Sequence, residues 1–350
     1  MVPPPFPDEV PEPVESAKQA TMVDVARRAG VSYQTVSRVI NKHPSVAPKT
    51  RERVLAAVEE LDYHPNVAAR NLVTRRSHTV GIVSYGTSYF GPGQMLTNIE
   101  ASLREREYGL MLSTLSELGS EHLRAAILEL RSRSVDGIVM ITPMYDVDVD
   151  AIPALCGNVP FVLIDVALGV QAPSVVIDQR HGGVLATRHL LELGHRRIAV
   201  ICGPLTWSAA TLRNEGTLGV LSDADLEPVM SVEGDWSASS GFAGACELLD
   251  AGARFSALVV ANDQMALGAM RALRERGLRV PEDVSVVGFD DLPEAAYFEP
   301  PLTTVHQDFV SLGRQSAEYL GALLDEPTTP PMQRVITPEL ITRSSTRGWG

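Results

Sequence analysis

Apolar residues recur at helical spacing in two short stretches near the start of the chain. The first stretch opens at Thr21, whose hydroxyl can cap a helix together with the carboxylate of Asp24 three residues later. Gly30 interrupts the spacing, and Ser32 can cap a second helix. The apolar face of that second helix is formed by Val36, Val39 and Ile40. Two short helices joined by a turn that contains glycine indicate a helix-turn-helix.

The second predicted helix keeps hydrogen-bonding side chains away from its apolar face. They are Tyr33, Gln34, Ser37, Arg38 and Asn41. Such side chains near a helix N-terminus can reach base edges in the major groove of DNA. An ordinary solvent-exposed helical hairpin would carry the same polar face, so the sequence that follows has to decide between the two.

Two further helical segments follow. Residues 48–61 begin with Pro48 at the first helical position and turn Val54, Leu55, Val58 and Leu61 inward. Residues 67–73 follow Asn66 as their cap. Because isolated helices shorter than about 12 residues are marginal, we expect this second segment to order only on DNA or on a partner subunit.

From residue 79 onward, short apolar runs alternate with helical patterns. The first runs cover residues 80–84, 110–115, 135–141 and 159–165, with helices near 94–107, 120–132 and 149–156. A second series covers 175–178, 198–202, 229–232, 258–262 and 284–289, with helices near 181–193, 208–221, 238–250, 263–276 and 309–324. Buried runs separated by helices predict a parallel sheet covered on both faces. Two such series predict a bilobed α/β body whose cleft faces the carboxyl ends of the strands.

The distribution of charge changes how the whole chain is interpreted. The formal net charge is −13, which taken alone argues against binding to nucleic acid. Residues 21–78, however, hold ten Arg and Lys residues against five acidic ones, so the acidic excess lies elsewhere. A basic N-terminal region on an acidic body favours phosphate contact by that region alone.

Residues 21–78 resemble the DNA-binding headpiece and hinge of the LacI/GalR family of transcriptional regulators, and the run YQTVSRVIN at 33–41 is especially similar. The resemblance implies base-edge contacts from Tyr33, Gln34 and Arg38. It implies phosphate contacts from Thr21, Ser32, Thr35, Ser37, Asn41 and Thr50. In the hinge it implies DNA contacts from Asn66, Ala69, Arg70 and Leu72, with Arg75 and Arg76 near phosphates. Leu72 would wedge into the minor groove and kink the DNA; alternatively, Leu72 only packs against a second hinge.

Polar residues gather at the predicted strand ends of the bilobed body. Asp165, Asn262-Asp263 and Asp290-Asp291 each follow an apolar run, Arg213 lies on the helix after a Gly-Pro loop, and Trp236 lies in a polar loop. Carboxylates, an amide and a guanidinium can hold sugar hydroxyls, while an indole face takes the C–H side of the ring. Asp263 could instead cap the helix that follows it, and Trp236 could be a packing residue.

The body resembles the periplasmic-binding-protein-like core of the same family, through EGDWS (233–237), VANDQMALGAMRA (260–272), SVVG (285–288) and PPLTT (300–304). The resemblance implies inducer contacts from Asp165, Arg213, Trp236, Asn262, Asp290 and Gln307. It implies apolar contacts from the segment 89–92, including Tyr89, and from Met95 and Phe309. Two positions depart from the family pattern: Ala209 stands where a serine would contact the sugar, and Ile177 replaces a phenylalanine.

Composition excludes several other classes of protein. Cys156, Cys202 and Cys246 are odd in number and lie in apolar or helical runs, so we expect neither disulfides nor a metal site. Residues 1–17 are rich in proline and acids, without the apolar core of a signal peptide. No apolar run approaches the roughly 18 residues of a membrane span, and we expect a cytoplasmic protein without a cofactor.

The expected organisation is a disordered, proline-rich N-terminal segment at 1–17, a helix-turn-helix domain at 18–65, a hinge helix and linker at 66–78, and a bilobed core at 79–345. We expect lobe 1 to cover about 79–177 plus 306–335, and lobe 2 about 178–305 plus 336–345. The first-lobe helices would form a homodimer surface, and no leucine heptads follow them.

These observations predict a transcriptional repressor of a sugar-utilisation operon. It would bind a pseudo-palindromic operator as a dimer, and a saccharide, expected to be a galactoside, would release it. An alternative is a co-repressor-type member, whose ligand tightens DNA binding; a purine site of that kind should carry more stacking aromatics than Trp236 with Tyr89 or Phe90. A glycosidase using Asp165 and Asp290 is a third possibility, but no sequence feature marks a nucleophile or a raised pKa.

Overall fold

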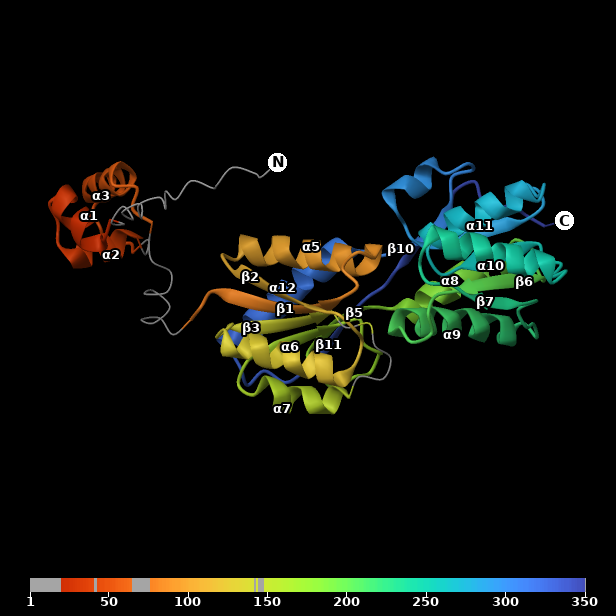
Figure 1. Ribbon diagram of the computed structural model, residues 1–350, viewed down its shortest axis with the longest axis horizontal. Helices are drawn as coiled ribbons and strands as arrows, with labels where there is room; N and C mark the ends of the chain where they lie inside the picture. Colours follow the sequence, from red (N-terminus) through yellow and green to blue (C-terminus); the bar gives the residue numbers. More distant parts are fainter. Residues whose placement is uncertain (1–19, 41–42, 65–75, 142, 144–147, 350) are drawn as a thin grey trace, which may run out of the picture. The chain divides into compact units, whose positions relative to one another are not determined.

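The computed structural model describes residues 20–40, 43–64, 76–141, 143 and 148–349, and the chain divides into two compact units between Arg75 and Arg76. The first unit contains α1 (Met22–Ala29), α2 (Tyr33–Ile40) and α3 (Pro48–Glu60), drawn in red and orange in Figure 1. The predicted hinge helix at 67–73 lies outside the described residues.

Local side chains fix the ends of the first two helices. The Thr21 hydroxyl accepts a hydrogen bond from the Asp24 amide at 3.3 Å, and the Asp24 carboxylate accepts one from the Thr21 amide at 3.0 Å, which completes a capping box. Gly30 ends α1 with a φ of 63°, a backbone conformation that glycine adopts without strain. The Ser32 hydroxyl accepts from the Thr35 amide at 3.2 Å at the start of α2. The helices enclose a small core in which Val25, Val36 and Val54 are fully buried.

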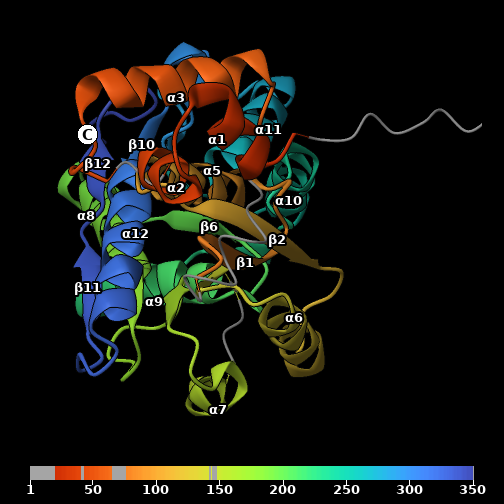
Figure 2. The ribbon, with the colours of Figure 1, turned by 90° about the vertical axis from the view of Figure 1, so that its left-hand side faces the viewer.

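The second unit contains two six-stranded sheets, and the one that we call the first lobe has the strand order β11-β5-β4-β3-β1-β2. Its strands are β1 (Thr79–Tyr85), β2 (Gly109–Leu115), β3 (Gly137–Ile141), β4 (Phe161–Ile164), β5 (Ser174–Ile177) and β11 (Gln333–Ile336), and all neighbours are parallel. One face packs against α5 (Phe90–Glu105) and α12 (Phe309–Asp325). The other face packs against α6 (Ser120–Ser132) and α7 (Ile152–Cys156), preceded by η1 (Val149–Ala151); Figure 2 shows α12 and α6 on opposite sides of this sheet.

The second lobe has the order β12-β10-β9-β8-β6-β7. Its strands are β6 (Ile198–Cys202), β7 (Ser231–Glu233), β8 (Ala257–Val260), β9 (Ser285–Asp290), β10 (Thr303–His306) and β12 (Glu339–Ile341), of which only β12 runs antiparallel to its neighbour. Helices α8 (Gln179–Glu192) and α9 (Ser208–Asp223) cover one face. Helices α10 (Ala238–Asp250) and α11 (Asp263–Glu275) cover the other, and η2 (Pro293–Tyr297) follows β9.

These two parallel sheets confirm the predicted fold class, with local corrections. The run at 175–178, which the alternation groups with the second series although the expected bound of lobe 1 at 177 includes most of it, is β5 of the first sheet, because the chain crosses to the second lobe only after it. Helix α5 begins at Phe90 instead of residue 94, since a proline is tolerated in a first helical turn and Pro92 lies there. Strands β10, β11 and β12 were not predicted.

The chain passes between the two lobes after β5, between β10 and α12, and between β11 and β12. In the part of the chain that the structure describes, no helix has the length and apolar character needed to cross a membrane. Cys156 and Cys202 are buried free thiols, and burial raises their pKa to about 12 and about 11 respectively, while Cys246 is only partly buried.

Candidate DNA-binding surface and ligand pocket

Helix α2 presents its predicted base-reading side chains to solvent. Tyr33 is 52% exposed, and Gln34 and Arg38 are exposed beside it. Among the predicted phosphate contacts, Thr21 and Ser32 are exposed and Thr35, Ser37 and Thr50 are half-buried. The buried valines on the opposite side of α2 fix the rotation of the helix, so that these polar groups share one surface of the first unit.

Some expected DNA contacts cannot be located on this surface. Asn41, Asn66, Ala69, Arg70 and Leu72 lie outside the described residues. Arg76, which the resemblance implies near phosphates, donates a hydrogen bond to the Leu324 carbonyl at 3.3 Å and lies 3.8 Å from the Asp325 carboxylate. In this structure Arg76 therefore anchors the start of the second unit to the end of α12.

A cavity lies between the two lobes. Eight of the nine predicted ligand residues line it, namely Tyr89, Met95, Asp165, Arg213, Trp236, Asn262, Asp290 and Gln307. Phe309 is the exception: its ring lies in the first-lobe core and meets Phe90 edge-on, with centroids 6.0 Å apart. Phe309 therefore supports the pocket wall from behind, because α12 turns its side chain towards the sheet.

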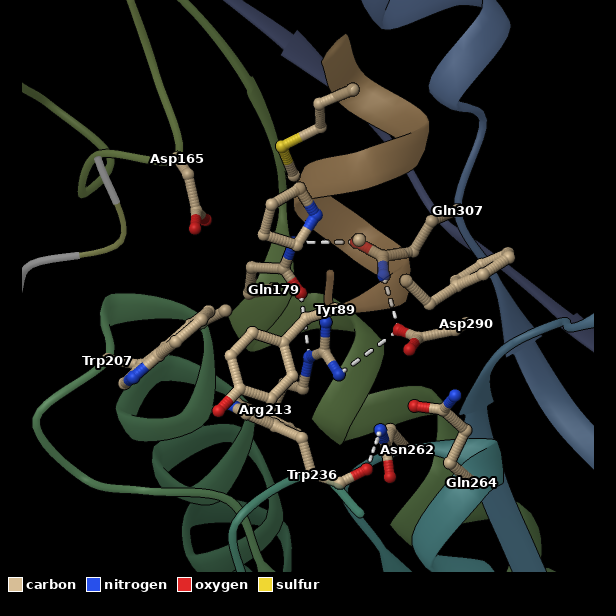
Figure 3. Close-up of a pocket in the computed structure, with 15 residues that line it drawn as sticks. Tyr89, Asp165, Gln179, Trp207, Arg213, Trp236, Asn262, Gln264, Asp290 and Gln307 are labelled. Atoms are coloured by element: carbon tan, nitrogen blue, oxygen red, sulfur yellow. Dashed lines mark hydrogen bonds and ion pairs between the residues drawn. The ribbon is translucent and has the colours of Figure 1, made fainter. Parts of the chain in front are cut away.

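Four polar side chains in the pocket form a closed hydrogen-bonded ring (Figure 3). Arg213 Nε donates to Gln179 Oε1 at 2.9 Å, and Gln179 Nε2 donates to Gln307 Oε1 at 2.8 Å. Gln307 Nε2 donates to Asp290 Oδ1 at 2.6 Å, and the Arg213 guanidinium lies 3.3 Å from the same oxygen. Each member orients the next, so the pocket is organised in advance of any ligand.

The ring holds a buried charge pair. Arg213 also donates to the Ala261 carbonyl at 2.5 Å, and its guanidinium carbon lies 3.8 Å from the centroid of the Phe289 ring. Burial lowers the pKa of Arg213, while the nearby carboxylates of Asp290 and Asp165 oppose that shift. Burial raises the pKa of Asp290 to about 6 against the opposing effect of Arg213 and Gln307. The pair is satisfied on both sides, which is the condition under which buried charges are tolerated.

Asp165 lies apart from this ring (Figure 3). Its carboxylate accepts no hydrogen bond from the described residues, and burial raises its pKa to about 6, opposed by Arg213. Asp165, Trp236 and Asp290 have φ values of 61°, 74° and 102°, in the left-handed region that residues other than glycine rarely adopt. Strained residues of this kind concentrate at functional sites, so their occurrence around one cavity indicates a binding site.

Trp236 is fixed from two directions. Its six-membered ring lies over Gly203, where an added Cβ would come within 2.3 Å of Trp236 Cη2. Asn262 donates to the Trp236 carbonyl at 3.0 Å and accepts from the Met265 amide at 2.9 Å, so Asn262 both holds Trp236 and caps α11. Within the described residues, the buried indole N–H of Trp236 has no acceptor, and a ligand oxygen could satisfy it.

The alternative role considered for Asp263, as the cap of the helix that follows it, is wrong. It does not cap α11, since Asn262 does. Its carboxylate instead accepts hydrogen bonds from the Thr304 hydroxyl at 2.6 Å and the Leu292 amide at 2.8 Å, and it is fully buried. Burial raises its pKa to about 8. Asp263 therefore ties the loop after β9 to strand β10.

The pocket also contains residues that the sequence did not single out as ligand contacts. They are Gln179, Trp207 and Gln264. The rest of the expected segment 89–92 also lines the pocket, and so does Ala209. Gln179 opens α8 directly after β5, so the rule that sites gather at strand ends could have found it. Ile177 is buried in the first-lobe core.

The geometry defines a class of protein: a helix-turn-helix unit joined to a two-lobed ligand-binding core of the periplasmic-binding-protein type. Family models agree, since "Bacterial regulatory proteins, lacI family" matches residues 21–66 and "Periplasmic binding protein-like domain" matches residues 187–346. The chain is 41% identical over 303 residues to the lactose operon repressor of Escherichia coli K12, covering 87% of this chain and 84% of that protein. The chain therefore belongs to the lacI family of bacterial transcriptional regulators.

Two other relatives extend the comparison. The PurR transcriptional repressor of Haemophilus influenzae is 36% identical over 337 residues, covering 94% of this chain and 99% of PurR. The crystal structure of the lac repressor dimer bound to operator and the anti-inducer ONPF has a TM-score of 0.88 at 38% identity, and the match covers 94% of this chain and 100% of that one. These relatives are repressors of transcription, not enzymes, and this chain is a repressor of the same family with a sugar-binding type of core.

Proposed function

We propose that this protein represses a sugar-utilisation operon and leaves its operator when a saccharide, most simply a galactoside, enters the pocket between the lobes. The observation that carries the proposal is the closed ring of Arg213, Asp290, Gln179 and Gln307, with Asp165 facing the same cavity. Carboxylates and amides arranged in this way hold hydroxyl groups, and a ligand without matching hydroxyls would leave them unpaired.

The charges of the lining favour a neutral ligand. The described lining carries the carboxylates of Asp165 and Asp290 against the single guanidinium of Arg213. Arg213 already donates to Gln179 and Ala261 and forms an ion pair with Asp290. Its charge is therefore largely neutralised by Asp290 and is poorly placed to bind an anionic ligand. Phosphate groups need such a cation or a helix N-terminus directed at them. A neutral saccharide fits the pocket better than a sugar phosphate.

The DNA-binding roles rest on exposure and on similarity to the family. Exposed Tyr33, Gln34 and Arg38 on α2 are the side chains that we assign to base edges, since Arg pairs well with guanine and Gln with adenine. We assign phosphate contacts to Thr21, Ser32, Thr35, Ser37 and Thr50, and hinge contacts to the segment 66–72. Phosphate contacts set register, and base contacts set sequence preference.

The coupling between the two sites would run through the pair of subunits. A pseudo-palindromic operator requires a twofold dimer, and apolar Leu112 on β2 and Leu128 on α6 are each 42% exposed on the first lobe. The saccharide would favour one arrangement of the lobes, and with it one arrangement of the hinges at 66–78. Only a difference in saccharide affinity between the two arrangements can drive the release.

A co-repressor mode is the second candidate, and one observation favours it more than the sequence suggested. Trp207 joins Tyr89, Phe90 and Trp236 in the lining, so the pocket holds more aromatic rings than expected. The polar ring still favours a polyhydroxylated ligand over a flat base. The two modes differ only in the direction in which the ligand changes operator affinity. Measuring whether the ligand weakens or tightens operator binding separates them.

Isothermal titration calorimetry with a panel of galactosides and glucosides tests the ligand assignment. We expect one member to bind, with Trp236→Ala weakening that binding while operator affinity in ligand-free protein is retained. Trp349→Phe is the matched control, because the Trp349 ring lies against His195, with centroids 5.5 Å apart, and does not line the pocket. Absence of binding by every saccharide in the panel would overturn the assignment.

A further inference from the structure

Trp207 lies where the two lobes meet above the pocket. It precedes α9 of the second lobe and is only 7% exposed. Its indole meets Tyr85 and Tyr89 of the first lobe, with centroids 5.8 and 5.2 Å away and interplanar angles of 61° and 85°. It also meets Trp236 of its own lobe at 5.8 Å and 67°. A single side chain thus joins the aromatic residues contributed by both lobes.

The backbone around Trp207 is fixed as tightly as its ring. The amide of Ser208 donates to the Pro143 carbonyl at 2.9 Å, and its hydroxyl donates to the Asp165 carbonyl at 2.8 Å, so the start of α9 is bonded to the first lobe. Gly86 lies below the aromatic pair with a φ of 64°. A Cβ at Gly86 would come within 2.7 Å of the Tyr89 ring and 3.2 Å of Trp207 Cη2. The position of the indole is therefore determined before a ligand arrives.

The pocket consequently has two chemically different parts. The ring of Arg213, Asp290, Gln179 and Gln307 forms a polar part, and Tyr89, Trp207 and Trp236 form an aromatic part (Figure 3). The polar part offers carboxylate, amide and guanidinium groups, which can hold the hydroxyls of a sugar ring. Aromatic side chains offer a large apolar surface to flat rings and to the C–H faces of sugars.

Trp207 could simply be a packing residue between the lobes, since it belongs to the second-lobe core. Packing alone, however, does not require it to line the cavity, as it does together with Tyr89.

We infer that Trp207 is a specificity-determining residue that selects glycosides with a second ring. The inference rests on the proposed function, in which the polar part of the pocket holds a pyranose. The aglycone, either an aromatic ring or a second sugar, then packs against Trp207 and Tyr89. One aromatic contact of this kind changes affinity roughly 3- to 10-fold, and that is the preference expected for a two-ring ligand over its methyl counterpart.

Calorimetry on the full-length protein with methyl β-galactoside, phenyl β-galactoside and lactose tests this inference. Wild-type protein and the control Trp349→Phe should prefer at least one two-ring ligand over the methyl glycoside by roughly 3- to 10-fold. Trp207→Ala should lose that preference, and Trp207→Phe should keep most of it. Phenyl β-galactoside and lactose distinguish an aromatic aglycone from a second sugar.

The outcomes separate the inference from the function on which it rests. If wild-type protein binds the methyl glycoside as tightly as both two-ring ligands, the inference fails and the saccharide function stands. The inference also fails if Trp207→Ala weakens all ligands equally, because Trp207 then acts only on the shape of the core. If wild-type protein binds none of the three and no other sugar, the proposed function fails with it. Should Trp207→Ala not fold, Trp207→Leu replaces it, since it fills space without offering a flat ring.

Discussion

Protonation of Asp165 should control how tightly the pocket holds a saccharide. Burial raises the pKa of its carboxyl group to about 6, and the described residues donate no hydrogen bond to it. The ionised carboxylate can accept hydrogen bonds from two sugar hydroxyls, whereas the protonated form loses part of that capacity. Ligand binding therefore favours the ionised form, and affinity should fall as the pH drops through 6.

The size of the effect follows from the population of the ionised form. With a pKa of about 6, roughly 90% of the Asp165 carboxyl groups are ionised at pH 7 and roughly 10% at pH 5. If the saccharide binds only when Asp165 is ionised, its affinity falls about tenfold between pH 7 and pH 5. Asp290 also has a pKa raised to about 6, and its protonation would weaken the ring with Arg213 and Gln307 and add to the loss.

Calorimetry with phenyl β-galactoside between pH 5 and pH 8 measures this dependence, and the Asp165→Asn variant isolates the contribution of one residue. Below pH 6, the logarithm of saccharide affinity should change with pH less steeply in the variant than in wild-type protein. The difference in slope should be about one, which corresponds to one proton fewer coupled to binding. Any remaining slope belongs to Asp290. A variant whose slope equals that of wild-type protein would refute the role of the Asp165 carboxylate.

Three further substitutions probe other parts of the molecule. Gly203→Ala should lower saccharide affinity, because its Cβ would come within 2.3 Å of Trp236 and displace that ring, while operator affinity measured without ligand stays unchanged; equal loss at both sites would instead indicate general unfolding. Arg38→Ala should relax operator preference at one base pair by about 1–3 kcal/mol in a binding selection, with Arg188→Ala, at an exposed position of α8, as the control; an unaltered preference would remove Arg38 from base recognition. Leu128→Glu should shift the sedimentation of the protein from dimer to monomer, because it places a charge on an exposed apolar position of α6; a dimer that persists would place the interface elsewhere.

The sequence was sufficient for the parts of the fold that local chemistry determines. The capping box at Thr21 and the glycine at position 30 give the ends of α1 directly. The buried apolar runs give most of the parallel strands. The assignment of the run at 175–178 to a lobe was not available from periodicity, because nothing in the run marks where the chain crosses from one sheet to the other.

The pocket shows a similar limit. Residues at strand ends, such as Asp165 and Asp290, can be expected near a cleft because parallel strands end at one edge. Whether a helix residue faces the cleft depends on the rotation of its helix in the folded core, and Phe309 at the start of α12 turns into that core. Trp207 lies in the loop before α9, and no local pattern reports that this loop reaches the cleft. The hydrogen-bonded ring depends on distances between residues 17 to 128 positions apart in the chain, which no local pattern reports.

The most direct test of the account measures operator binding as the pocket fills. A twofold-symmetric DNA selected by this protein from a random pool would be titrated, by fluorescence anisotropy, with and without saturating saccharide. The account predicts that the saccharide weakens DNA binding and that the DNA weakens saccharide binding by the same factor, since coupling between two binding sites is reciprocal. DNA affinity that is unchanged by a saccharide shown to occupy the pocket would contradict it, and tighter binding would establish the co-repressor mode in its place.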